Sequence, residues 1–167
     1  HASVAEHAVV HMAVENISRL ACDTLEDNRL ASYTEKSSRY QVLERNAFFE
    51  PQELGDEKYL ATYRNACQYL FDSYTHMVSK MMDSLPLVLP QTNGESNGGY
   101  RLRLRRAAVD SCRFVLPAST LTNVGVTMNA RSMEHAITKL LSSGLQEERA
   151  IGDELLEQGR MITPTLI

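Results

Sequence analysis

Hydrophobic positions along this chain follow two periods, which divide it into strands and helices. The Val-rich run at 8–14 and the alternating, β-branched run at 120–128 predict strands. Between 56 and 84, apolar residues recur every three or four positions, which predicts a long helix buried on one side. We expect four further helices from the same spacing, at 17–25, 100–115, 129–141 and 145–158.

Loop signals complete the expected fold. Leu116-Pro117 ends the helix at 100–115, and Gly144 is a candidate C-cap between the last two helices. The Pro- and Gly-containing stretch 86–99 is expected to be a loop, whereas 40–43 is expected to form a short strand. Segment 28–40 has few apolar residues, which indicates a site-forming loop. The predicted fold class is α+β, with a small mixed or antiparallel sheet packed against long helices.

Composition narrows the class of protein without naming a function. The 167 residues are 43% hydrophobic and 23% charged, which is typical of one globular domain over 1–167. No apolar window approaches about 18 residues, so we expect no membrane span. The net charge of −4 lacks the basic footprint of a general nucleic-acid binder.

The cysteines and the first residue add two expectations. Cys22, Cys67 and Cys112 are odd in number and not in metal-ligand spacing, so we expect reduced thiols in a cytoplasmic protein and no metal site. The chain opens with His1 and not with a basic and then apolar secretory signal. Because the first residue is His1 and not Met, we expect either a processed protein or a fragment of a longer chain.

Candidate chemistry is concentrated in three polar sets. The first precedes the first strand, the second lies in the expected loop, and the third spans the end of one helix and the start of another. In that order, they are His1, Ser3, Glu6 and His7; Arg29, Ser32, Glu35, Ser37 and Arg39; and Arg113, Asn129, Arg131 and His135.

The second and third sets allow two interpretations, of which the first is anion binding. Guanidiniums beside hydroxyls suit a phosphate, and a helix N-terminus attracts negative charge. The alternative is structural: Ser37 or Asn129 caps a helix and the arginines are solvated. Glu6-His7 is more typical of a structural hydrogen bond than of an acid/base couple. The run of Arg101, Arg103, Arg105 and Arg106 suits a solvated helix face better than nucleic-acid phosphates, because only Tyr100 could stack on a base.

Taken together, these sets resemble the flavin-dependent thymidylate synthases. The family's Arg-His-Arg, seven residues, Ser motif corresponds to Asp27-Asn28-Arg29 and Ser37, with Glu35, Arg39 and Tyr40 in place. His1-x-Ser3-x-x-Glu6-His7 resembles a second family motif. Two more are matched by Arg113-x-x-Leu116-Pro117 and by Thr127-x-Asn129-Ala130-Arg131-Ser132. The order and separations agree from His1 to about Leu156.

This resemblance implies a function and a set of ligands. The implied reaction is FAD-dependent reductive methylation of dUMP, or a related uracil nucleotide, to dTMP. The carbon donor would be methylenetetrahydrofolate and the reductant NADPH. The implied assembly is a homotetramer with shared flavin sites, or a tandem partner domain, with no nucleic acid and no membrane as partner.

Carried over by motif, the resemblance also assigns residues. Arg29 and Ser37 are the candidate catalytic residues. The implied nucleotide ligands are Glu35, Ser37, Arg39 and Arg113. The implied FAD ligands are His1, Ser3, Glu6, Arg29, Asn129, Arg131 and His135.

Several positions depart from the family pattern. Asp27 and Asn28 replace the first Arg and the His of the triplet, and Thr24 replaces a Gln or Glu. A nucleotide-binding Arg falls at Leu140, beside Lys139. The family's first strand and helix, ahead of His1, are absent from the sequence. The alternative hypothesis is therefore a non-catalytic structural or regulatory domain that has lost the active site.

Overall fold

The computed structural model describes residues 3–41 and 43–166, which divide into two compact units. Unit 1 comprises residues 1–36, 49–55 and 118–167, and unit 2 comprises residues 37–48 and 56–117. Each unit has its own hydrophobic core. The single thymidylate synthase-like domain expected over 1–167 stays a prediction.

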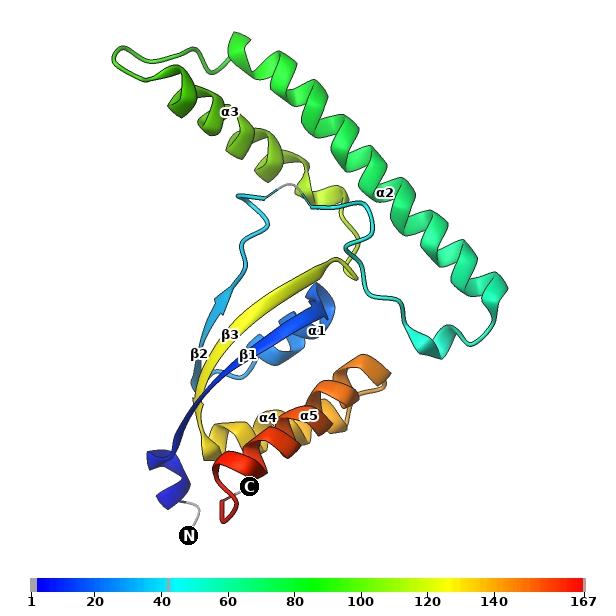
Figure 1. Ribbon diagram of the computed structural model, residues 1–167, viewed down its shortest axis with the longest axis vertical. Helices are drawn as coiled ribbons and strands as arrows, with labels where there is room; N and C mark the ends of the chain where they lie inside the picture. The colour runs from blue at the N-terminus through cyan, green and yellow to red at the C-terminus, as the bar shows by residue number, and fades with distance from the viewer. Residues whose placement is uncertain (1–2, 42, 167) are drawn as a thin grey trace. The chain divides into compact units, whose positions relative to one another are not determined.

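Unit 1 contains an antiparallel sheet of three strands, ordered β1-β3-β2 (Figure 1). The strands are β1 (Val9–Ser18), β2 (Ala31–Glu35) and β3 (Leu121–Asn129). The expected strands at 8–14 and 120–128 are thus confirmed, as is the α+β class.

Two local predictions around β2 were wrong. The expected loop 28–40 contains β2, which pairs with β3 from Ala31 opposite Met128 to Glu35 opposite Val124. Only two apolar side chains of β2 pack against the core, so its alternation is too short to read in the sequence. The strand expected at 40–43 does not form in the described residues 40, 41 and 43.

Three helices pack on one face of this sheet, because alternate β3 residues are apolar and buried. Val124, Val126 and Met128 contact the core formed by α1 (Arg19–Glu26), α4 (Ala130–Leu141) and α5 (Gln146–Ile162). The last two helices confirm the expected ones at 129–141 and 145–158. The helix expected from residue 17 begins at Arg19, because Ile17 and Ser18 still belong to β1.

The packing of α4 on α5 depends on a glycine that the sequence analysis did not single out. A Cβ on Gly152 would lie 3.0 Å from Leu140 Cβ. Gly144 is not the C-cap that the sequence predicted, because α4 ends at Leu141 and Ser142 is its C-cap. The glycines with positive φ in the described part of the chain are Gly55 and Gly94.

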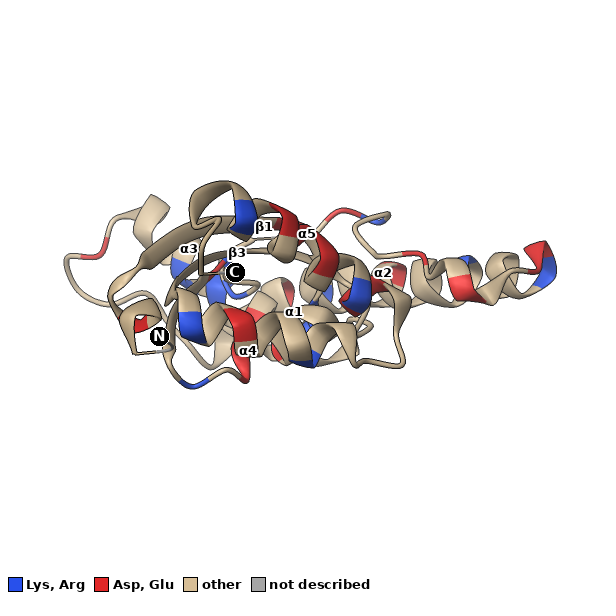
Figure 2. Ribbon diagram, turned by 90° about the horizontal axis from the view of Figure 1, so that it is seen from below, with Lys and Arg blue, Asp and Glu red and all other residues tan. Residues whose placement is uncertain are grey.

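Figure 2 shows that acidic residues line the outer part of α5.

Unit 2 is built on α2 (Glu57–Ser84) and α3 (Asn97–Cys112), which pack through Tyr74, Leu104 and Val109. The long helix expected at 56–84 is confirmed. The helix expected at 100–115 begins three residues earlier and ends in a 3₁₀ turn, Arg113–Val115. No helix in the described part of the chain is long and apolar enough to cross a membrane.

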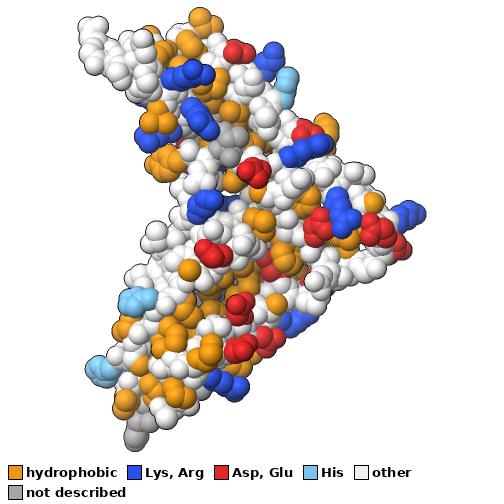
Figure 3. All heavy atoms as spheres, viewed as in Figure 1, with side chains coloured by type: hydrophobic (Ala, Val, Ile, Leu, Met, Phe, Trp, Pro, Cys, Tyr) orange, Lys and Arg blue, Asp and Glu red, His pale blue; other side chains and the backbone are white. Residues whose placement is uncertain are grey.

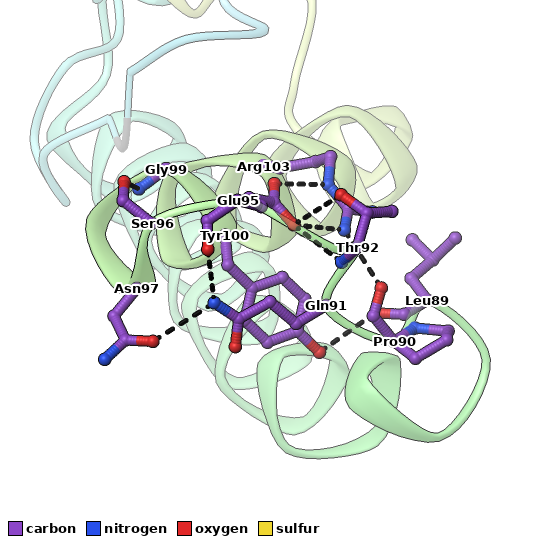
Figure 4. A network of polar contacts seen from close by, with 10 residues as sticks. All are labelled: Leu89, Pro90, Gln91, Thr92, Glu95, Ser96, Asn97, Gly99, Tyr100 and Arg103. Carbon is purple, nitrogen blue, oxygen red and sulfur yellow. Dashed lines mark hydrogen bonds and ion pairs between the residues drawn. The ribbon is translucent and has the colours of Figure 1, made fainter.

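The loop between α2 and α3 is ordered by polar contacts (Figure 4). The Arg103 guanidinium lies 2.9 Å from each Glu95 carboxylate oxygen and also donates to the Pro90 carbonyl. The hydrogen bond from Arg103 lowers the pKa of Glu95 to about 2. Ser96 caps α3 by accepting from the Gly99 N–H at 3.1 Å. The arginine run is therefore partly structural.

Candidate functional site

A wide groove opens in unit 1 where two chain segments meet beside a short helix. The Ala130 N–H donates to the Ala8 carbonyl at 2.8 Å, which holds the start of α4 against the 3₁₀ helix Val4–His7. The turn between α1 and β2 forms the other wall. The groove has a volume of about 1090 Å³ and is lined by Glu6, Asp27, Asn28, Arg29, Leu30, Asn129, Arg131, Ser132 and His135.

The groove brings together most of the residues to which the resemblance gives an FAD-binding role. Glu6, Arg29, Asn129, Arg131 and His135 all line it. Ser3 is exposed and does not line it, and His1 lies outside the described residues. Three stretches far apart in the sequence thus meet in one cavity.

Two of these side chains already have structural partners. Asn129 Oδ1 accepts from the Ser132 N–H at 2.8 Å, so Asn129 is the N-cap of α4, as the structural alternative expected. Arg131 forms an ion pair with Glu6. Both contacts leave the N-terminus of a 12-residue helix facing the groove, where its dipole favours an anion.

Position 27 is balanced by a residue that the sequence analysis assigned no role. Asp27 Oδ2 lies 2.5 Å from Lys139 Nζ, which also donates to the Thr24 carbonyl at 3.2 Å. The hydrogen bond and the positive charge of Lys139 lower the pKa of Asp27. The negative charge that replaces a family arginine is therefore neutralised locally.

Asn28 has an unused acceptor beside the groove. Its side chain is 5% exposed and donates to the Leu25 carbonyl at 2.7 Å. Its Oδ1 is buried and has no hydrogen-bond partner in the described part of the chain. A buried acceptor without a donor is costly, but this oxygen has no exposed surface and so offers no contact to a ligand in the groove.

Two further residues named in the sequence analysis serve the architecture of unit 1. Leu140 is fully buried in the core, so it offers no contact to a nucleotide. Glu35 accepts from Arg19 at 2.7 Å and from the Thr122 hydroxyl at 2.8 Å.

Burial raises the pKa of the Cys22 thiol to about 12, which keeps the thiol neutral.

Unit 2 holds the remaining predicted nucleotide ligands in a cluster around Asp110. Arg39 Nε and Arg113 Nε lie 3.2 Å and 3.0 Å from the same oxygen, Asp110 Oδ1. Arg113 also donates to the Ser38 hydroxyl at 3.3 Å, and Ser37 Oγ accepts from the Arg39 N–H at 3.3 Å. Asp110 was not among the predicted site residues, although its i,i+3 spacing to Arg113 is visible in the sequence.

The chain is an α+β protein with a wide groove in unit 1 and an arginine cluster in unit 2. The family model described as "Thymidylate synthase complementing protein" matches residues 1–165, and the chain belongs to this family.

Relatives of two kinds are similar to the chain. A UPF0159 protein of Chlamydia muridarum is 30% identical over 99% of this chain and 32% of its own length. The flavin-dependent thymidylate synthase of Geobacter sulfurreducens is 30% identical over 99% of this chain and 62% of its own length. The chain therefore spans about a third of the former and less than two thirds of the latter.

A solved structure supports the fold. The crystal structure of thymidylate synthase X from Helicobacter pylori, with FAD and dUMP, matches at a TM-score of 0.55 and 21% identity. The match covers 99% of this chain and 76% of that one. The expected likeness of fold is thus confirmed.

Proposed function

We propose that this chain binds FAD and a uracil nucleotide and acts as a flavin-dependent thymidylate synthase. The reaction would be reductive methylation of dUMP with methylenetetrahydrofolate, with NADPH as reductant. One observation carries the proposal: five side chains that the resemblance associates with FAD line one groove of about 1090 Å³.

The groove suits a dinucleotide in size and in donors. Its volume slightly exceeds the roughly 300–1,000 Å³ of ordinary small-molecule sites. Arg29 and the N-terminus of α4 offer positive charge to a pyrophosphate. Reduced flavin, when bound, supplies a hydride; the residues of this chain hold and orient the ligand.

The arginine cluster of unit 2 supports the nucleotide part of the proposal. Arg39 and Arg113 present guanidiniums suited to a phosphate, and Ser37 and Ser38 bring hydroxyls to the same loop. Ser37 and Arg29 remain the candidate catalytic residues.

A second candidate function is a non-catalytic partner of an active homologue. It is favoured by the Asp27–Lys139 pair, which turns a position of the family's motif into a structural contact, and by the burial of Leu140. Such a chain would keep ligand binding and lose the reaction.

Flavin titration tests the binding step. We expect the purified chain to quench FAD fluorescence, and Arg29→Ala to weaken FAD about 10–100-fold, because a hydrogen bond to a charged group is worth about 1.5–3 kcal/mol. Arg160→Ala, on an exposed part of α5 outside the groove, is the matched control and should leave the affinity unchanged. Absence of FAD binding, or equal affinities of the two variants, would contradict the proposal.

Tritium release from carbon 5 of dUMP, with FAD, NADPH and methylenetetrahydrofolate present, then separates the two candidates. Release supports the synthase. FAD and dUMP binding without release supports the non-catalytic partner.

A further inference from the structure

We infer that Asp110 is a built-in counter-ion that competes with phosphate for Arg39 and Arg113, and so sets the affinity and selectivity of the unit 2 cluster for phosphorylated ligands. The inference rests on the proposed function only in taking dUMP as the natural ligand. The competition itself follows from the contacts within unit 2.

One carboxylate oxygen forms an ion pair with both guanidiniums. Asp110 Oδ1 lies 3.2 Å from Arg39 Nε and 3.0 Å from Arg113 Nε, so it occupies the space beside both Nε atoms. A guanidinium binds phosphate best through a pair of parallel N–H groups, and one such pair includes Nε–H. A phosphate that takes this geometry on both arginines must displace Asp110.

The cluster is open enough for a ligand to reach it. The side chains of Arg39, Asp110 and Arg113 are 56%, 48% and 34% exposed. Arg106, one turn before Asp110 on α3, lies 5.0 Å from the centre of the ring of Tyr40, the residue that follows Arg39 in the loop. Figure 3 shows basic side chains gathered over the α3 side of unit 2.

The charges of the cluster favour a phosphate dianion once the Asp110 carboxylate is displaced. Two guanidiniums pair with one carboxylate in this cluster, which leaves an excess of one positive charge. The carboxylate repels an approaching anion and acts little on an uncharged nucleoside. Asp110 therefore lowers the affinity for dUMP and holds the two arginines in place when no phosphate is bound.

The test compares Asp110→Asn with wild type, using dUMP, inorganic phosphate and deoxyuridine as probes in calorimetric titrations at two salt concentrations. The amide keeps the size and the acceptor oxygen of Asp110 but removes its charge. An exposed ion pair is worth a factor of roughly two to five, so releasing two should tighten dUMP about tenfold. Phosphate should tighten likewise, deoxyuridine should not change, and the salt dependence of dUMP binding should steepen.

Asp72→Asn is the matched control. Asp72 forms an exposed pair with Arg45 in the same unit, at 2.9 Å, and shares no partner with Asp110. Its affinity for each probe should equal that of wild type, so a general effect of net charge would appear in both variants.

The outcomes separate this inference from the proposed function. If wild type binds dUMP and Asp110→Asn binds it equally or more weakly, the counter-ion role is wrong and the function stands. If Asp110→Asn tightens inorganic phosphate while neither protein binds dUMP, the counter-ion role holds and the uracil nucleotide is wrong. If neither protein binds either anion, or deoxyuridine tightens as much as dUMP, the inference is overturned, whatever the FAD titration gives.

Discussion

The charge reversal at residue 27 has a distant partner that makes it tolerable. Asp27 stands where the family motif has an arginine, and Lys139, 112 positions away, approaches it to 2.5 Å. Lys139 also donates to the Thr24 carbonyl and so ties the end of α1 to α4. The substitution is visible in the sequence, but its partner is not, because only the fold brings α4 beside the end of α1.

The pair predicts a specific dependence on pH. The pKa of Asp27 is lower in the folded chain than in the unfolded one, so the stability it contributes is present above the unfolded value of about 3.9. That stability is lost as pH falls through the lowered folded pKa. Lys139→Ala should therefore destabilise the chain at pH 7 and make little difference at a pH below the folded pKa of Asp27.

Two measurements check the prediction for Asp27. Carboxyl NMR titration should show the pKa of Asp27 rising toward its ordinary value in Lys139→Ala and staying low in Lys36→Ala, and thermal melts at the two pH values should follow. A destabilisation that is the same at both pH values would mean that Lys139 acts by packing and not by charge.

At the scale of elements, the contact between α4 and α5 depends on the absence of one side chain. A Cβ on Gly152 would meet Leu140 Cβ at 3.0 Å and Leu141 Cδ2 at 3.1 Å. Leu140 is fully buried and its Cβ is fixed by the backbone, so the contact is relieved only by moving a helix.

Gly152→Ala should therefore destabilise unit 1. Overpacking lowers the free energy of unfolding by about 1–3 kcal/mol, and the better helix propensity of alanine raises it by about 1 kcal/mol. The net loss of stability should be about 1 kcal/mol. Gly144→Ala, where nothing lies within 4 Å of the added Cβ, should stay within about 0.5 kcal/mol of wild type. Urea unfolding of the two variants measures the difference in stability. If Gly152→Ala were more stable than wild type, Leu140 and Leu141 would have moved to accommodate the added methyl group, and the prediction would be wrong.

What the sequence could predict of the elements depended on the length of each pattern. The 28 residues of α2 carry eight turns of consistent apolar spacing, whereas β2 has five residues and two core contacts. For the candidate site, the family motifs predicted residues that line the groove, because the spacing of those motifs is retained from residue 27 to residue 135. Lys139 and Asp110 were missed, because their importance comes from partners that only the fold brings near.

At the scale of the whole molecule, the net charge of −4 is the sum of net charges of opposite sign on the two units. Unit 2 has ten Lys and Arg against seven Asp and Glu, a net charge of +3, and unit 1 has seven against 14, a net charge of −7. The acidic total charge therefore describes unit 1 and not unit 2, which is basic. Anionic ligands are expected at the basic arginine cluster of unit 2 and, in unit 1, at the helix N-terminus within the groove.

Assembly and flavin binding should be coupled if the sites are shared between subunits, as the family resemblance implies. A ligand that binds only the assembled form stabilises it by mass action, so FAD should shift the chain toward a homotetramer. Sedimentation at two protein concentrations, with and without FAD, should then give a mass that rises with FAD. The dissociation constant for FAD should fall as protein concentration rises. A monomer that binds FAD with the same affinity at every concentration would show that the groove of unit 1 is sufficient by itself.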